Sequence, residues 1–170
     1  GAPLICVDVD TGREVWKISF RETYWGCDPA IADGILVILN TYDNCIYAFA
    51  KGPTATTVAV DDDSVKLGEA VVIKGTVVDI SPGTRDYRIA LRFPGGVPAI
   101  ADEDMSRWME YVYMQFPPRP TDISGVWVKL DAVNVYTGEY IDIGGTHTDP
   151  YSGMFTVSWQ PPKEGLWWII

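Results

Sequence analysis

Short runs of alternating apolar and polar residues, separated by glycine, proline and aspartate, recur through almost all of this 170-residue chain. Alternation with a period of two is typical of a strand with one buried face, and turn residues at regular intervals favour antiparallel neighbours. The chain is therefore predicted to be all-β. We expect strands at residues 4–9, 13–20, 29–32, 35–40, 45–50, 54–60, 70–80, 125–135, 140–143, 154–159 and 166–170.

One segment has a different period. Apolar residues in 105–116 fall at helical spacing, acidic residues precede them, and Pro117 and Pro118 follow. Negative charge in the first turn favours a helix, and proline ends it. Upstream, Tyr87, Ile89, Leu91 and Phe93 alternate, which predicts an extra strand. The helix is defined by the stripe Met105, Trp108, Met109, Val112 and Phe116, after the acidic cluster Asp102, Glu103 and Asp104.

Composition excludes several classes of protein. With 47% hydrophobic and 21% charged residues, the chain can bury a core. A net charge of −10 argues against nucleic-acid binding, because phosphate recognition needs a basic face. No apolar run reaches the roughly 18–20 residues of a membrane span, so we expect no membrane insertion within this chain. The scarcity of heat-labile Asn and Gln is typical of a thermophile.

The first fifty residues contain a recognisable repeat. The run Ile5-Cys6-Val7-Asp8, with Thr11-Gly12 and Trp16, resembles the signature of pyrroloquinoline-quinone-type (PQQ-like) β-propeller repeats of archaeal and bacterial proteins. Residues 29–34 and 42–49 look like the rest of that repeat. The resemblance implies that residues 1–52 form a partial, four-stranded propeller blade. Because one repeat cannot enclose a central site, we expect no quinone and no other cofactor.

Lys51-Gly52-Pro53 is a natural boundary. Beyond it, Val65-Lys66-Leu67-Gly68-Glu69 and the pattern from Thr148 to Leu166 resemble immunoglobulin-like domains of bacteria and archaea. This resemblance implies an immunoglobulin-like β-sandwich over 53–170, with a helix-containing insertion at about 85–124. Its final strand is expected to be truncated at Ile170, which leaves an edge able to pair with another chain.

The sequence allows two interpretations of the oxidation state of the cysteines. Cys6, Cys27 and Cys45 include no CxxC pair, and the chain has one histidine, so no metal site is expected. Cys27 and Cys45 form one disulfide in an oxidising compartment, or all three remain thiols. The acidic run at residues 61–63 is interpreted as a solvated turn rather than a calcium loop, because no loop with regularly spaced ligands follows.

Two constellations suggest hydrolysis. His147 lies near Asp149 and Ser152 in sequence, as a Ser-His-Asp esterase would require. Asp102, Glu103 and Asp104 offer a carboxylate pair for a glycosidase. No Gly-x-Ser-x-Gly motif accompanies His147. Helix capping and a solvated face explain the acidic cluster more simply.

The chain is rich in aromatic residues, with seven Trp and nine Tyr. We predict a non-catalytic structural, adhesive or binding module of an extracellular, cell-surface protein, which pairs with a protein partner or with itself through exposed strand edges. A carbohydrate-binding β-sandwich module is the first alternative and a hydrolase the second. Aromatic rings anchor interfaces and stack on sugars. The predicted contact surface consists of Trp108, Tyr111, Tyr113, Trp167 and Trp168.

Overall fold

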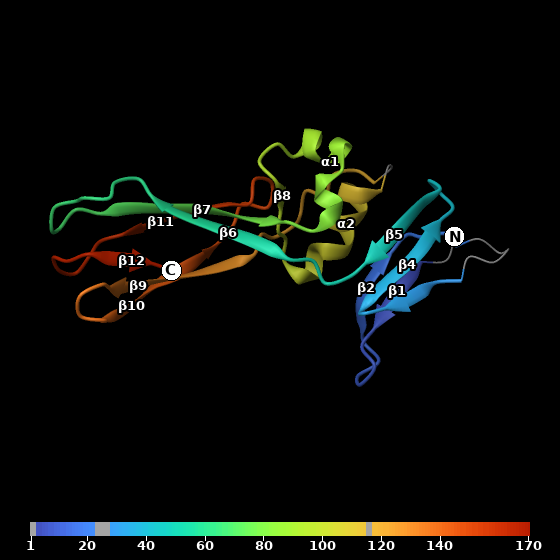
Figure 1. Ribbon diagram of the computed structural model, residues 1–170, viewed down its shortest axis with the longest axis horizontal. Coiled ribbons are helices and arrows are strands. Elements are labelled where there is room, and N and C mark those ends of the chain that lie inside the picture. The colour runs from blue at the N-terminus through green and yellow to red at the C-terminus, as the bar shows by residue number, and fades with distance from the viewer. Residues whose placement is uncertain (1–2, 23–27, 115–116) are drawn as a thin grey trace. The chain divides into compact units, whose positions relative to one another are not determined.

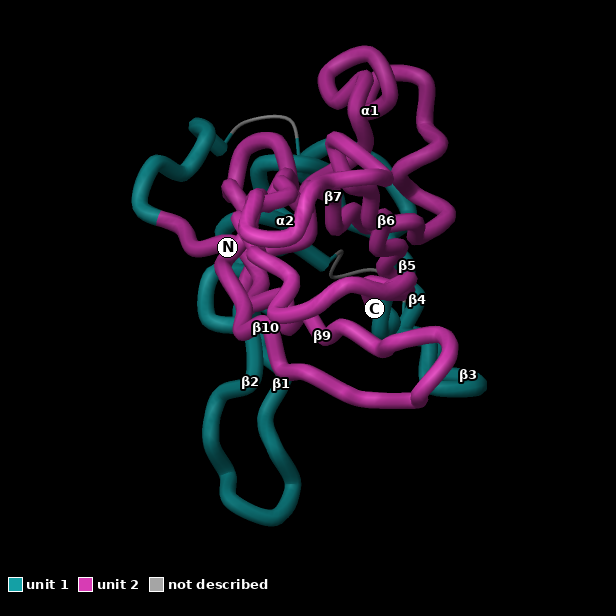
Figure 2. The backbone as a smooth tube through the Cα atoms, turned by 90° about the vertical axis from the view of Figure 1, so that its left-hand side faces the viewer, with its two compact units in different colours: residues 1–52, 102–122 teal, residues 53–101, 123–170 magenta. Residues whose placement is uncertain are grey.

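A computed structural model describes residues 3–22, 28–114 and 117–170. These residues form twelve strands in several sheets and two α-helices, so the predicted all-β class is confirmed. The chain divides into two compact units, coloured separately in Figure 2. The first comprises residues 1–52 and 102–122, and the second comprises 53–101 and 123–170. The segment expected as an insertion thus contributes to both units.

The first unit contains two small antiparallel sheets. Strands β1 (Leu4–Val7) and β2 (Glu14–Ile18) form one pair. Strands β3 (Ala30–Ala32), β4 (Ile35–Asn40) and β5 (Cys45–Phe49) form the other sheet, in that order. Alternate residues point inward, as the two-residue period requires. They build a core from Ile18, Phe20, Ile38 and Met114, with the rings of Trp16, Tyr47 and Phe49 packed against it.

The predicted helix is confirmed in this unit. A 3₁₀ turn, η2 (Asp102–Asp104), leads into α2 (Met105–Tyr113). Trp108 and Val112, four residues apart, are both buried, whereas Phe116 lies outside the described residues. Glu110 accepts a hydrogen bond from the backbone N–H of Ser19 at 2.5 Å. The helix therefore supplies a partner to the backbone beyond the end of β2.

The second unit consists of two sheets around one core (Figure 1). One sheet has the order β11-β7-β6, with β8 beside β7, and the other has the order β10-β9-β12. Inward residues of both sheets, including Ile73, Leu130 and Phe155, form the core. The strands are β6 (Thr54–Val60), β7 (Val71–Asp79), β8 (Val97–Pro98), β9 (Trp127–Asn134), β10 (Tyr140–His147), β11 (Met154–Trp159) and β12 (Trp167–Ile169).

The extra strand predicted at residues 87–93 is wrong. This segment is helix α1 (Tyr87–Arg92), preceded by the 3₁₀ turn η1 (Pro82–Arg85). The Asp86 side chain accepts a hydrogen bond from the backbone N–H of Arg88 at 2.9 Å, which caps the helix. Ile89 is the buried residue of α1. A six-residue segment is too short for its alternation to outweigh a capping aspartate.

No helix in the described ranges is long and apolar enough to cross a membrane.

Candidate functional site: the outer face of the β10-β9-β12 sheet

The sheet β10-β9-β12 has one face against the core and one face toward solvent. Along β9, Val128, Leu130, Ala132 and Asn134 are buried and alternate with Trp127, Lys129, Asp131 and Val133. Residues paired across antiparallel strands share a face. The register therefore places further side chains on the outer face, which are Tyr140, Asp142, Gly145 and His147 of β10, Trp168 of β12, and Ile170 just beyond it.

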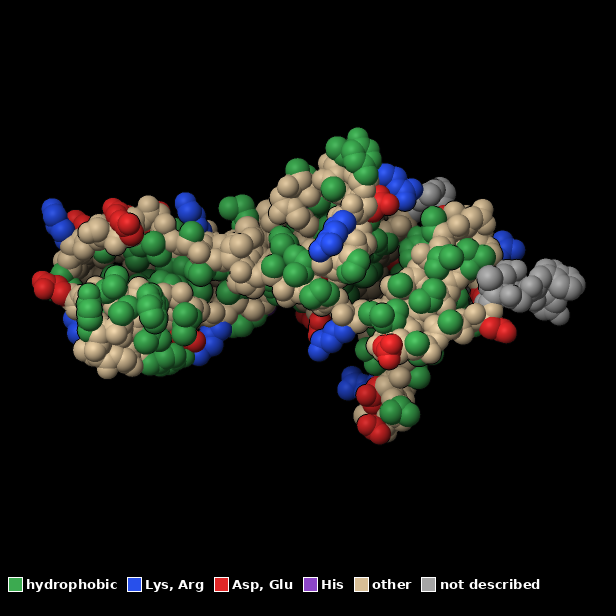
Figure 3. Space-filling view, viewed as in Figure 1, with side chains coloured by type: hydrophobic (Ala, Val, Ile, Leu, Met, Phe, Trp, Pro, Cys, Tyr) green, Lys and Arg blue, Asp and Glu red, His purple; other side chains and the backbone are tan. Residues whose placement is uncertain are grey.

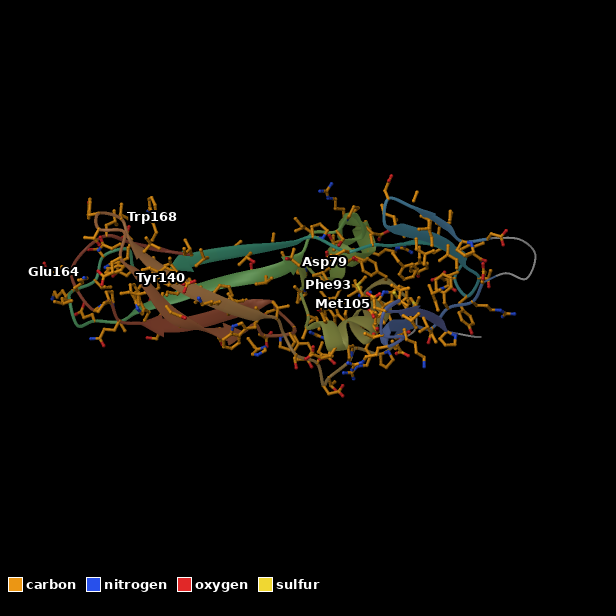
Figure 4. The ribbon with its side chains drawn as sticks, turned by 90° about the horizontal axis from the view of Figure 1, so that it is seen from below. Asp79, Phe93, Met105, Tyr140, Glu164 and Trp168 are labelled. Carbon is orange, nitrogen blue, oxygen red and sulfur yellow. The ribbon has the colours of Figure 1, made fainter. Side chains whose placement is uncertain are left out.

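Three of these side chains are large, exposed aromatic rings. Trp127, Tyr140 and Trp168 are 59%, 55% and 62% exposed, respectively. Tyr140 and Trp168 both pair with Val133, so they flank it in one row across three strands. Two strand spacings put their backbones about 9.6 Å apart. Figure 4 labels Tyr140 and Trp168 at the same end of the second unit, and Figure 3 shows hydrophobic side chains gathered there.

Trp127 lies against the surface of the sheet. A Cβ added to Gly145 would meet ring atoms Cζ2 and Cε2 of Trp127 at 2.6 and 2.8 Å. The absence of a side chain at residue 145 therefore creates the space in which the indole rests. The edge of the ring also meets His147, with centroids 5.1 Å apart and planes at 66°. Trp127 is thus held from beneath and from one side, while the rest of its surface faces solvent.

Gly144, next to Gly145, allows side chains of β10 to keep alternating between the core and the outer face. The register of β10 on β9 shifts between Asp142 and Gly144, and Gly144 has a φ of 101°. Only glycine adopts this backbone conformation readily. The resulting bulge lets Ile143 pack toward the core, while Asp142 and Gly145 both stay on the outer face.

Between the aromatic rings lies a charged network centred on Lys129. Its Nζ is 3.1 Å from the Tyr140 hydroxyl, 3.1 Å from Asp131 Oδ1 and 3.6 Å from Asp142 Oδ2. Hydrogen bonds to Tyr140 and then to Asp131 raise the pKa of Lys129. The Tyr140 hydroxyl is the largest contribution that lowers the pKa of Asp131, and the Lys129 ammonium lowers it further. The network holds Tyr140 in place, and it carries two carboxylates for one ammonium.

The five predicted contact residues are divided between the two units. Trp168 lies on the outer face, whereas Trp167 is on the inner face and contacts Trp159 with ring centroids 5.9 Å apart. Trp108, Tyr111 and Tyr113 belong to α2 in the first unit. Trp108 is 1% exposed, so its ring is not available to a ligand. The predicted contact surface did not include Trp127, Tyr140 or Lys129, although their alternation with apolar residues along β9 and β10 was a usable signal.

The residues that the sequence suggested for hydrolysis form other contacts in the structure. Nδ1 of His147 is 3.1 Å from the Gly125 carbonyl oxygen. Ser152 Oγ donates to Asp149 at 2.8 Å. In the acidic cluster, Asp104 is buried and paired with Arg107 at 2.5 Å, and Arg107 also reaches Asp122 at 2.7 Å. These contacts stabilise turns and the start of α2.

Cysteine and acidic residues give no metal centre among the described residues, since no group of three potential ligands occurs there. Neither Cys6 nor Cys45 is bonded to another cysteine among the described residues. Cys27 lies outside the described residues, so the pairing of Cys27 with Cys45 stays a prediction. In the acidic turn, Asp61 accepts a hydrogen bond from the Val72 N–H and Asp62 accepts one from the Ser64 N–H.

Comparisons with known proteins found no relative of this chain. No protein-family model, no curated protein and no solved structure matches the chain. The resemblances to PQQ-like repeats and to immunoglobulin-like domains therefore stay predictions.

Proposed function

We propose that the chain is a non-catalytic module of an extracellular or cell-surface protein, and that its second unit is an immunoglobulin-like sandwich that binds a glycan. The observation that carries this proposal is the presence of Trp127, Tyr140 and Trp168 on the outer face of one sheet. The apolar C–H face of a sugar ring packs on an aromatic face, and polar groups beside it bond the hydroxyls. The first alternative from the sequence is thus the function that the geometry favours.

The charge balance on this face favours an uncharged glycan. Asp131 and Asp142 accept hydrogen bonds, and Lys129 donates them. Since the face holds two carboxylates and one ammonium, and the chain carries a net charge of −10, glycans bearing carboxylates or sulfates are repelled. Tyr140 and Trp168 lie in one row across the strands and Trp127 lies at the other end of β9, which suits a linear polysaccharide that runs across or along the strands.

Affinity gel electrophoresis in the presence of soluble neutral polysaccharides tests the proposal. We expect retardation of the wild-type chain, and weaker retardation for Trp127→Ala, Tyr140→Ala and Trp168→Ala. An aromatic contact of about 0.5–1.5 kcal/mol corresponds to a roughly two- to tenfold loss of affinity for each ring. Tyr87→Ala is the matched control, because Tyr87 is 75% exposed on α1 and not on this face. Equal mobility of all four variants and the wild type would refute the proposal.

A structural, adhesive role has its own support in the first unit. Ile35 and Val37 of β4 and Ile46 of β5 are exposed on the outer face of the β3-β4-β5 sheet. Exposed apolar sheet faces are common at contacts with other chains. We expect sedimentation velocity to show concentration-dependent association that Val37→Lys weakens. A monomeric wild-type chain at every concentration would argue against this role.

A further inference from the structure

The Trp127 ring extends along the strands of the outer face rather than across them. Trp127 pairs with His147 in the register of β10 on β9. Its indole atoms nevertheless lie over Gly145, which is two residues from His147 along β10 and pairs with Lys129. The ring therefore points from its own row toward the middle of the sheet, in the direction of Tyr140.

Tyr140 extends in the opposite direction and meets Lys129. Tyr140 pairs with Val133, so four residues of β9, about 14 Å, separate its row from that of Lys129. Its hydroxyl is nevertheless 3.1 Å from Lys129 Nζ, so both side chains lie stretched along the strands toward each other. Nζ is 5.8 Å from the centre of the Tyr140 ring, and the hydroxyl oxygen lies between them. The ammonium therefore covers neither face of the ring.

The two rings are the ends of a strip that follows β9 and β10. The indole lies over the row of Gly145, and the Tyr140 ring lies between its own row and that of Asp142. Their centres are thus about three residues of strand apart, or roughly 10 Å. Strand β12 pairs with the other side of β9 and contributes nothing to the strip. This aromatic strip consists of Trp127, Lys129, Asp131, Tyr140 and Asp142.

Polar groups lie between the two rings. Lys129 Nζ carries donors, and the Asp142 side chain is 58% exposed. Asp142 Oδ1 accepts a hydrogen bond from the Gly144 N–H at 2.8 Å, whereas Oδ2 is 3.6 Å from Lys129 Nζ. That separation is too long for a hydrogen bond, so Oδ2 retains its capacity to accept one from a ligand. A ligand that spans the strip therefore needs an apolar face at each end and hydroxyls between them.

We propose that the aromatic strip binds an extended, β-1,4-linked neutral glycan that runs along β9 and β10. In such a chain alternate sugars turn the same face to one side, and two sugar units match the spacing of the rings. One sugar packs on Trp127. The hydroxyls of the next sugar bond Lys129 and Asp142, and the third sugar packs on Tyr140. An α-1,4-linked chain coils, so its sugars leave this line. The inference rests on the proposed glycan binding and adds the linkage and the direction of the chain.

Isothermal titration calorimetry with sugars of defined linkage and length tests the proposal. The probes are β-1,4-linked disaccharides and tetrasaccharides of glucose, mannose and N-acetylglucosamine, with maltose and maltotetraose as the α-1,4-linked counterparts. We expect at least one β-1,4-linked tetrasaccharide to bind about two- to tenfold more tightly than its disaccharide, because only the longer chain reaches both rings. Maltotetraose should show no such gain over maltose.

Single-ring variants identify the direction of the chain. Trp127→Ala should abolish the gain from length but still bind the disaccharide on Tyr140, which shows that the variant is folded. Trp168→Ala should keep the gain, because Trp168 lies on β12 and outside the strip. The reverse pattern would overturn the proposal, because the glycan would then run across the strands from Tyr140 to Trp168. Tyr87→Ala, on α1, is the control and should match the wild type.

Two further outcomes distinguish this inference from the proposed function. Retardation by soluble polysaccharides, without a gain in affinity for any β-1,4-linked tetrasaccharide, would overturn the linkage and direction and leave glycan binding intact. Absence of binding to both the tetrasaccharides and the polysaccharides would overturn the two proposals together.

Discussion

Gly145 is a position on the aromatic face at which the structure leaves no room for a side chain. In Gly145→Ala, the new Cβ would lie 2.6 Å from Trp127 Cζ2 and 2.4 Å from the Val128 carbonyl oxygen. Carbon atoms in contact prefer about 3.5–4.0 Å, so the indole must rise by about 1 Å and β10 must also move. Overpacking of this kind costs about 1–3 kcal/mol. We expect the free energy of unfolding to fall by that amount and the affinity for glycan to fall with it.

Urea unfolding followed by tryptophan fluorescence measures this cost, and a double-mutant cycle isolates its cause. In the Trp127→Ala background the ring is gone, so Gly145→Ala should cost about 1 kcal/mol less than in the wild type. Gly95→Ala is the control, because a Cβ at Gly95 meets no atom within 4 Å. That variant should be neutral or up to about 1 kcal/mol more stable. The same cost for Gly145→Ala in both backgrounds would show that Trp127 does not rest on Gly145.

Two further predictions concern single polar groups. Because the folded state lowers the pKa of Asp131, its contribution to stability is present above the ordinary aspartate pKa of about 3.9 and is lost as pH falls through the lowered value. Thermal unfolding from pH 6 to 2 should show this loss in the wild type and a smaller loss in Asp131→Asn; identical profiles would contradict it. The Tyr47 hydroxyl donates to Asp43 at 2.5 Å in the first unit. Tyr47→Phe should lower the free energy of unfolding by about 0.5–1.5 kcal/mol, and an unchanged urea midpoint would count against this bond.

The β-rich character follows from alternation that the structure reproduces in nearly every predicted run, β4, β6 and β11 having the predicted bounds. Glycan binding is a proposal that the gel electrophoresis above tests, whereas the extracellular location and the propeller and immunoglobulin-like assignments stay predictions.

The sequence alone determined the local structure, because alternation, turn residues and the helical stripe of α2 act over a few neighbouring positions. The prediction from the sequence failed at residues 87–93. The alternating pattern favours a strand and the capping aspartate favours a helix, and the pattern is too short to show which of the two forms. Only the tertiary structure decided which aromatic residues share a surface. Trp127, Tyr140 and Trp168 come to one face through the register of β10 and β12 on β9. This register arises from pairing between distant segments, which no local pattern specifies.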